Sequence, residues 1–133
     1  MNILIIDGQG GGIGKQLVSA IKVRFPTYRI TAVGTNSAAT SAMLKAGADE
    51  AATGENAVVV NCRYADVIIG PVGIAIADSL MGEITPTMAK AIGQSPAKRI
   101  LLPLNRCNTI IAGVSDLAIG NLIPCVLDEL MRV

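Results

Sequence analysis

The residues best suited to chemistry lie near the amino terminus, in a glycine-rich segment that follows a short apolar run. Five of the seven residues from 8 to 14 are glycine, and a lysine comes next. Glycine lets the backbone approach an anion closely, and the first turn of a following helix offers free N–H groups at the positive end of its dipole. We therefore expect a phosphate-bearing small molecule to bind along Gly8, Gln9, Gly10, Gly11, Gly12, Ile13, Gly14 and Lys15.

Small and polar residues also follow the later strand patterns of the chain. Ligands of open α/β sheets bind beyond the carboxyl ends of the strands, so residues at these ends gather at one edge. A guanidinium at this edge is suited to grip a phosphate or a carboxylate through two parallel hydrogen bonds. The further candidates for holding a cofactor are Thr35, Asn36, Gly70, Gly73, Asn105 and Arg106.

The elements that must position these residues alternate between strand and helix patterns. We expect strands at 3–6, 28–33, 48–52, 65–70 and 99–104. We expect helices at 13–25, 37–46, 55–63 and 86–93, and a last one from about residue 121. The segment 74–84 is irregular or a loose helix, and 109–114 is predicted to be an edge strand.

This alternation predicts an α/β fold with three layers and a mostly parallel sheet. Right-handed crossovers then favour a Rossmann-like strand order of 3-2-1-4-5, with the edge strand added. No internal repeat, low-complexity stretch or linker divides the chain, so 1–133 is expected to be a single domain.

The composition limits the classes of ligand and partner. The net charge is +1 and no Trp or basic block is present, so we expect no binding to nucleic acid. The longest uncharged apolar run, 67–77, is too short to cross a bilayer, so we expect no membrane segment. The chain is 51% hydrophobic and 16% charged, which is apolar for a monomer and predicts a homo-oligomer, most simply a homodimer.

The usage of cysteine and histidine points to a reducing compartment without a metal site. The three cysteines, Cys62, Cys107 and Cys125, lie far apart in the sequence, and histidine is absent. An odd number of scattered cysteines is typical of a reduced cytoplasmic protein, and this pattern lacks the spacing of metal ligands. We expect a cytoplasmic protein that holds no metal.

The glycine segment is similar to the cofactor-binding turn of the short-chain dehydrogenases. Gly8, Gly12 and Gly14 match that turn, and the preceding strand is in the right place. Those enzymes also need a Tyr and a Lys four residues apart for proton transfer, and neither Tyr28 nor Tyr64 has a lysine at that spacing. The chain is also too short for their complete fold.

The end of the second strand pattern bears on the choice of dinucleotide. A carboxylate at this place binds the ribose 2′-OH of NAD. Thr35, Asn36 and Ser37 stand there instead. The sequence therefore favours NADP over NAD, and another nucleotide remains possible.

Two other known sites share part of the pattern. The residues Gly11 to Lys15 resemble the deviant phosphate loop of the ParA and MinD ATPases, but Gln16 stands where a Ser or Thr must hold magnesium. Asp7, at the end of the first strand, resembles a phosphatase nucleophile, but Gln9 replaces the second aspartate of such sites. A solvated or turn-capping Asp7 is the favoured interpretation.

No catalytic constellation is evident, so the catalytic residues stay unassigned and three functions stay open. The first is a nucleotide-binding protein without a stated reaction. The second is an enzyme acting on a small phosphorylated or acyl substrate, with Asp7, Glu83 or Cys107 in chemical roles. The third is a regulatory or assembly subunit that binds no ligand.

Several strings of the sequence are distinctive in combination. They lie at 6–15, 44–48, 52–57, 81–86 and 102–107, and read IDGQGGGIGK, LKAGA, ATGENA, MGEITP and LPLNRC. On these strings the chain resembles a family of short bacterial proteins, mostly from Firmicutes, classed as a domain of unknown function. The resemblance implies a small cytosolic protein with a Rossmann-like fold, and it implies no substrate.

Overall fold

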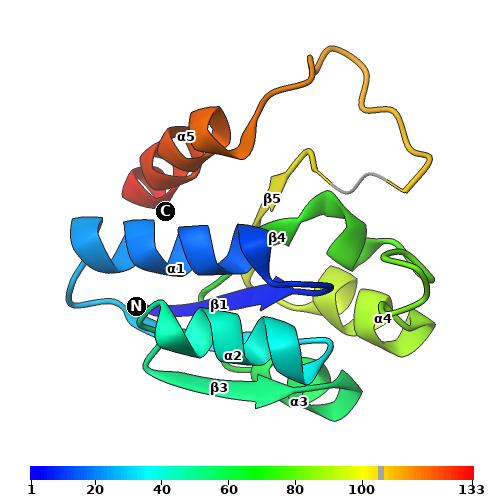
Figure 1. Ribbon diagram of the computed structural model, residues 1–133, viewed down its shortest axis with the longest axis horizontal. Helices are drawn as coiled ribbons and strands as arrows, with labels where there is room; N and C mark the ends of the chain where they lie inside the picture. The colour runs from blue at the N-terminus through cyan, green and yellow to red at the C-terminus, as the bar shows by residue number, and fades with distance from the viewer. Residues whose placement is uncertain (105–106) are drawn as a thin grey trace.

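The computed structural model describes residues 1–104 and 107–133, and a five-stranded sheet forms its centre (Figure 1). The strand order is β3-β2-β1-β4-β5, and every pairing is parallel, which confirms the predicted order. The strands are β1 (Asn2–Asp7), β2 (Arg29–Gly34), β3 (Glu50–Thr53), β4 (Val67–Pro71) and β5 (Lys98–Leu102). Because all strands run the same way, their carboxyl ends share one edge.

Helices cover both faces of the sheet, as the three-layer prediction requires. One face is covered by α1 (Gly12–Arg24), α2 (Ser37–Lys45) and α5 (Ile119–Arg132). The other face is covered by α3 (Glu55–Asn61) and α4 (Pro86–Gln94), with a 3-10 turn, η1 (Val72–Ala75), after β4. Right-handed crossovers produce this division. The connections through α1 and α2 move along the sheet toward β3, and those through α3 and α4 move in the opposite direction toward β5, so the two pairs of helices lie on opposite faces.

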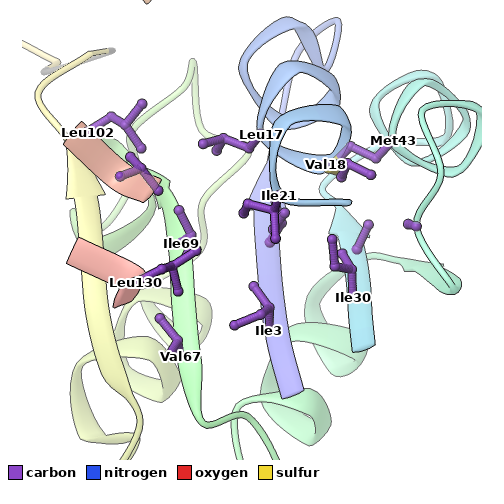
Figure 2. Packing of buried hydrophobic residues seen from close by; sticks show 14 of the residues in the cluster. Ile3, Leu17, Val18, Ile21, Ile30, Met43, Val67, Ile69, Leu102 and Leu130 are labelled. Atoms are coloured by element: carbon purple, nitrogen blue, oxygen red, sulfur yellow. The ribbon is translucent and has the colours of Figure 1, made fainter. Parts of the chain in front are cut away.

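The central strand β1 is buried on both faces, which explains its uninterrupted apolar run. Ile3 and Ile5 pack with Leu17 and Ile21 on the α1 face, as Figure 2 shows for Ile3 and both α1 residues. The alternate residues of β1 belong to the second cluster, on the α3 and α4 side. Successive side chains of a strand point to opposite faces, so one short run supplies both cores.

Capping residues precede two helices, α2 and α4, which begin at the predicted residues Ser37 and Pro86. Asn36 precedes α2, and its Oδ1 accepts a hydrogen bond of 2.9 Å from the Ala39 N–H. Thr85 precedes α4, its Oγ1 accepts from the Met88 N–H, and Pro86 occupies the first helical position. Capping groups of this kind satisfy N–H donors that the first turn leaves unpaired.

The carboxyl-terminal part departs from the prediction in two places. The segment 109–114 is not a strand, so that prediction is wrong. Gly113 takes a φ of +81°, and the chain sweeps away from β5 before returning to α1 through α5 (Figure 1). The helix α5 begins at Ile119 rather than near residue 121, which places Pro124 inside the helix. Apolar, β-branched residues favour a strand, but the described part of this segment leads away from the sheet and pairs with no strand there.

Candidate functional site

A tight glycine loop joins β1 to α1 at the carboxyl edge of the sheet. The Gly11 N–H donates to the Gly8 carbonyl at 2.9 Å, and Gly11 has a φ of +73°. The loop touches the end of β2, where the Thr35 N–H donates to the carbonyl of Asp7 at 3.0 Å. The structure therefore brings the glycine segment together with Thr35, as the sequence predicts for residues at strand ends.

Asp7 anchors this loop from beneath. Its side chain is 2% exposed, its Oδ1 accepts from the Gly8 N–H at 2.8 Å, and its Oδ2 accepts from the Gly14 N–H at 2.7 Å. Burial raises the pKa of the Asp7 carboxyl above its usual range, and the N–H groups of Gly14, Gly8 and Ile13 act against that rise. Asp7 is thus a buried turn-capping residue and is not solvated.

Glu83 contacts the same loop at Gln9 and also contacts the end of β2. Its Oε1 accepts from the Gln9 N–H at 2.7 Å and from Thr35 Oγ1 at 2.9 Å. Its Oε2 accepts from Asn36 Nδ2 at 3.0 Å. Burial alone would raise the pKa of Glu83, but these three hydrogen bonds outweigh it and leave that pKa below the usual value. Glu83 is therefore a carboxylate at neutral pH.

A strained turn places Glu83 there. Asp78, Leu80 and Met81 all take a positive φ, between 54° and 66°, and Gly82 follows with a φ of +87°. Each left-handed residue other than glycine costs about 1 kcal/mol or more, and such strain gathers at functional sites. The turn is held by its own backbone bonds, including the Asp78 N–H to the Ile84 carbonyl at 2.7 Å.

Three glycines of the loop are required by packing. A Cβ atom at Gly8 would lie 2.6 Å from Glu83 Oε1, and one at Gly11 would lie 2.9 Å from the backbone of Ala39. At Gly14 it would collide with the side chain of Met43. These glycines allow β1, α1, α2 and the Glu83 turn to meet closely.

Gly10 and Gly12 have no such reason to be glycine. No described atom lies within 4 Å of a Cβ atom placed at either residue, and neither takes a positive φ. Both are exposed, and their N–H groups have no acceptor among the described residues. Lys15, which is also exposed, follows in the first turn of α1. This outer side of the loop is open to a ligand.

The remaining predicted site residues lie in different surroundings. Gly70 is buried in the sheet, where a Cβ atom would collide with the carbonyl oxygen of Ile6 on β1. Gly73 is also buried, and its carbonyl accepts from Ser79 Oγ. Asn105 and Arg106 lie outside the described residues. The structure thus brings residues 8–15, Thr35 and Asn36 together, with Gly70 and Gly73 packed beneath the surface of the same edge.

An open groove of about 1100 Å³ adjoins the loop on the α1 face. It runs between α1, α2 and α5, with alanines along its length and Ile123 and Leu127 from α5. Lys15, Arg24 and Lys45 also line it, and none of its described lining residues is acidic. Lys15 belongs to both the groove and the glycine loop.

Residues 2–133 match a family described as a domain of unknown function, DUF3842. The chain belongs to the DUF3842 family. This match spans nearly the whole sequence and confirms the resemblance drawn from its five distinctive strings. No curated protein matches this DUF3842 chain.

Among solved structures, the DUF3842 chain is similar to a dodecameric FMN-dependent UbiX-like decarboxylase from Escherichia coli O157:H7. The TM-score is 0.47 and the sequence identity is 17%, over 98% of this chain and 77% of the decarboxylase chain. Within the described part of the DUF3842 chain, no helix has the length and apolar character that crossing a membrane requires.

The sequence named Glu83 as a candidate but missed its partners. In the DUF3842 chain its carboxylate accepts a hydrogen bond from the Gln9 N–H of the glycine loop, 74 residues earlier. Gly82 and the capped start of α4 are the local signals of a turn here, but they do not reveal what the turn contacts.

Proposed function

We propose that this protein binds a phosphate-bearing ligand, most simply a nucleotide, on the outer side of the glycine loop. The N–H groups of Gly10 and Gly12 would contact the phosphate, and Lys15 would add positive charge. The observation that carries the proposal is that both glycines are exposed and unneeded by the fold, with N–H groups that no described acceptor uses. A close approach by a ligand explains glycine at such positions.

The hydrogen bonds of the buried Asp7 side chain support a phosphate position on the outer side of the loop. Asp7 already takes the N–H groups of Gly8 and Gly14 on the inner side of the loop. The outer N–H groups and the amino end of α1 remain for an anion, because the helix dipole favours negative charge there. The end of β2, with Thr35 and Asn36, then lies on the side where the nucleoside would extend.

The substitution Gly12→Asp tests this site. We expect it to weaken phosphate-ligand binding by about 20-fold, because a carboxylate at the loop repels the anion and occupies its donors. Thermal-shift screening would cover NADP, NAD, AMP, ATP, GTP, FMN and inorganic phosphate, followed by calorimetry on any ligand found. Native mass spectrometry of gently purified protein would first reveal a retained ligand.

The matched control is Gly120→Asp in the first turn of α5. Gly120 is also exposed, and no described atom lies within 4 Å of a Cβ atom placed there. Both variants place an aspartate where the helix dipole stabilises it, so both are expected to fold. Equal affinity in folded Gly12→Asp and wild-type protein would place the ligand elsewhere. Absence of binding to every compound would favour a purely structural loop.

We also propose that the protein forms a homo-oligomer through the segment 107–118. This segment exposes large apolar side chains, with Ile110 90%, Leu117 42% and Val114 40% exposed. It has neither helix nor strand and leads away from the sheet (Figure 1). Exposed apolar groups of this kind are buried most readily against a second copy.

The substitution Ile110→Glu should raise the dissociation constant of the oligomer at least about tenfold, because a charge at an apolar contact must be desolvated. The protein should therefore be found as a smaller species. Light scattering after size exclusion, over a range of concentrations, measures this shift. Leu44→Glu, at an exposed leucine of α2, should leave the mass unchanged. A wild-type protein that is monomeric at all concentrations would contradict the proposal.

A further inference from the structure

The side-chain donors of Thr35 and Asn36, at the end of β2, are used within the protein. Thr35 has one hydroxyl hydrogen, and it is donated to Glu83 Oε1. Asn36 has two amide hydrogens, and they are donated to the Gln9 carbonyl at 2.9 Å and to Glu83 Oε2 at 3.0 Å. The Gln9 N–H is donated to Glu83 Oε1. The side chains of Thr35 and Asn36 and the N–H of Gln9 therefore have no hydrogen left to donate to a ligand.

Acceptor capacity remains at the same place. A carboxylate has about four lone-pair sites, and the three hydrogen bonds to Glu83 leave one of them open. Glu83 is half-buried, so this remaining site can be reached from solvent. The Thr35 oxygen also keeps lone pairs after donating its hydrogen. Beside Glu83, the end of β2 therefore offers acceptors, whereas the side-chain hydrogens of Thr35 and Asn36 are already used.

The charges around this cluster reinforce that chemistry. Glu83 forms no ion pair with any lysine or arginine of the described residues. Asp7 lies beneath the same loop, close enough for the charge of Glu83 to raise its pKa. A second anion placed beside Glu83 would meet a negative charge that no lysine or arginine of residues 1–104 and 107–133 pairs with.

We infer that Glu83 makes the end of β2 a subsite for a free hydroxyl group, and that it excludes a phosphate from this position. The inference rests on the proposed function, and it names the ligand class as a nucleotide whose ribose hydroxyls are unsubstituted. It reverses the preference for NADP, which depended on the absence of a carboxylate after the second strand. The tertiary structure supplies that carboxylate from a turn 48 residues away from Thr35.

Matched nucleotides test the subsite separately from the phosphate site. The probes are inorganic phosphate, AMP, 2′-deoxy-AMP, and the adenosine bisphosphates with a second phosphate on the 2′ or the 3′ oxygen. In the wild-type protein we expect each bisphosphate to bind at least about tenfold more weakly than AMP, because the added anion is uncompensated. We expect 2′-deoxy-AMP to bind roughly threefold more weakly, because one hydroxyl donor is lost.

The variant Glu83→Gln removes the charge and adds a donor at nearly the same volume. Its affinities for AMP and the bisphosphates should agree to within about threefold, since the repulsion is gone. Glu50→Gln is the matched control, because Glu50 is an exposed glutamate at the start of β3, on the opposite edge of the sheet. It should keep the wild-type ratio. A ratio of affinities reports specificity, which a purely structural role of Glu83 would not change.

Each outcome decides between the two proposals. Bisphosphates that bind the wild-type protein as tightly as AMP, with binding lost in Gly12→Asp, would overturn the hydroxyl subsite and leave the phosphate site standing. A ratio that Glu83→Gln does not change would also overturn it. If neither phosphate nor any nucleotide binds, the proposed function fails and this inference fails with it. The wild-type series needs no variant, so it remains decisive if Glu83→Gln does not fold.

Discussion

Replacing Asp7 with alanine lowers the free energy of unfolding by about 3 kcal/mol, because two hydrogen bonds to a carboxylate are lost and two buried donors are left unpaired. The donors are the N–H groups of Gly8 and Gly14, both buried. The gain from no longer burying a carboxylate offsets part of this loss. Chemical denaturation monitored by circular dichroism measures the effect.

The control for Asp7→Ala is Asp66→Ala. Asp66 Oδ2 accepts from the Asn2 N–H at 2.7 Å, so it makes the same kind of bond, but at an exposed position. Water can replace that carboxylate, and we expect a loss of less than about 1 kcal/mol. Equal losses for both variants would show that burial of the Asp7 interactions contributes nothing to the start of α1.

Replacing Gly70 with alanine lowers the free energy of unfolding by about 2–3 kcal/mol, because an added methyl group overpacks the sheet. The new Cβ atom would collide with the Ile6 carbonyl oxygen on β1 and lie 2.8 Å from Ile74 Cδ1. The first of these is backbone of the neighbouring strand and cannot turn aside. The strands β1 and β4 would therefore have to separate, and the same denaturation measurement reports the cost.

The contrasting variant is Gly12→Ala. Nothing described lies near a Cβ atom at Gly12, and the residue starts α1 without a positive φ. Alanine reduces the entropy of the unfolded chain, so this variant should be unchanged or more stable by up to about 1 kcal/mol. If Gly12→Ala were destabilised as much as Gly70→Ala, Gly12 would have a structural role and the argument for a ligand at this residue would weaken.

Some glycines are required by packing and others, such as Gly12, are not, and the sequence does not contain the information that separates them. A run of five glycines in seven residues indicates a loop where backbone comes close to something, and the loop lies where this pattern predicts. The pattern does not tell which glycines face another helix and which face solvent. That difference depends on Ala39 and Met43 of α2, which pack against Gly11 and Gly14.

The false edge strand has a related cause. The residues from 109 to 114 are apolar and β-branched enough to favour a strand by local preference. A strand also needs a neighbour with free backbone groups, and the path from β5 to α5 leads the segment away from the sheet (Figure 1). The packing of α5 on α1 therefore outweighs the local preference of these residues for a strand.

The sequence by itself determined the features that a few adjacent residues encode. These are the parallel α/β architecture, the strand order, the glycine loop after β1, and the helix starts at Asn36 and Thr85. Only the tertiary structure decided what meets at the loop. Asp7 turns inward beneath it, and Glu83 reaches it from 74 residues away in the chain. Periodicity and capping act within one or two turns of chain, whereas the charge and donor balance of a site depends on which distant turns the folded backbone brings together.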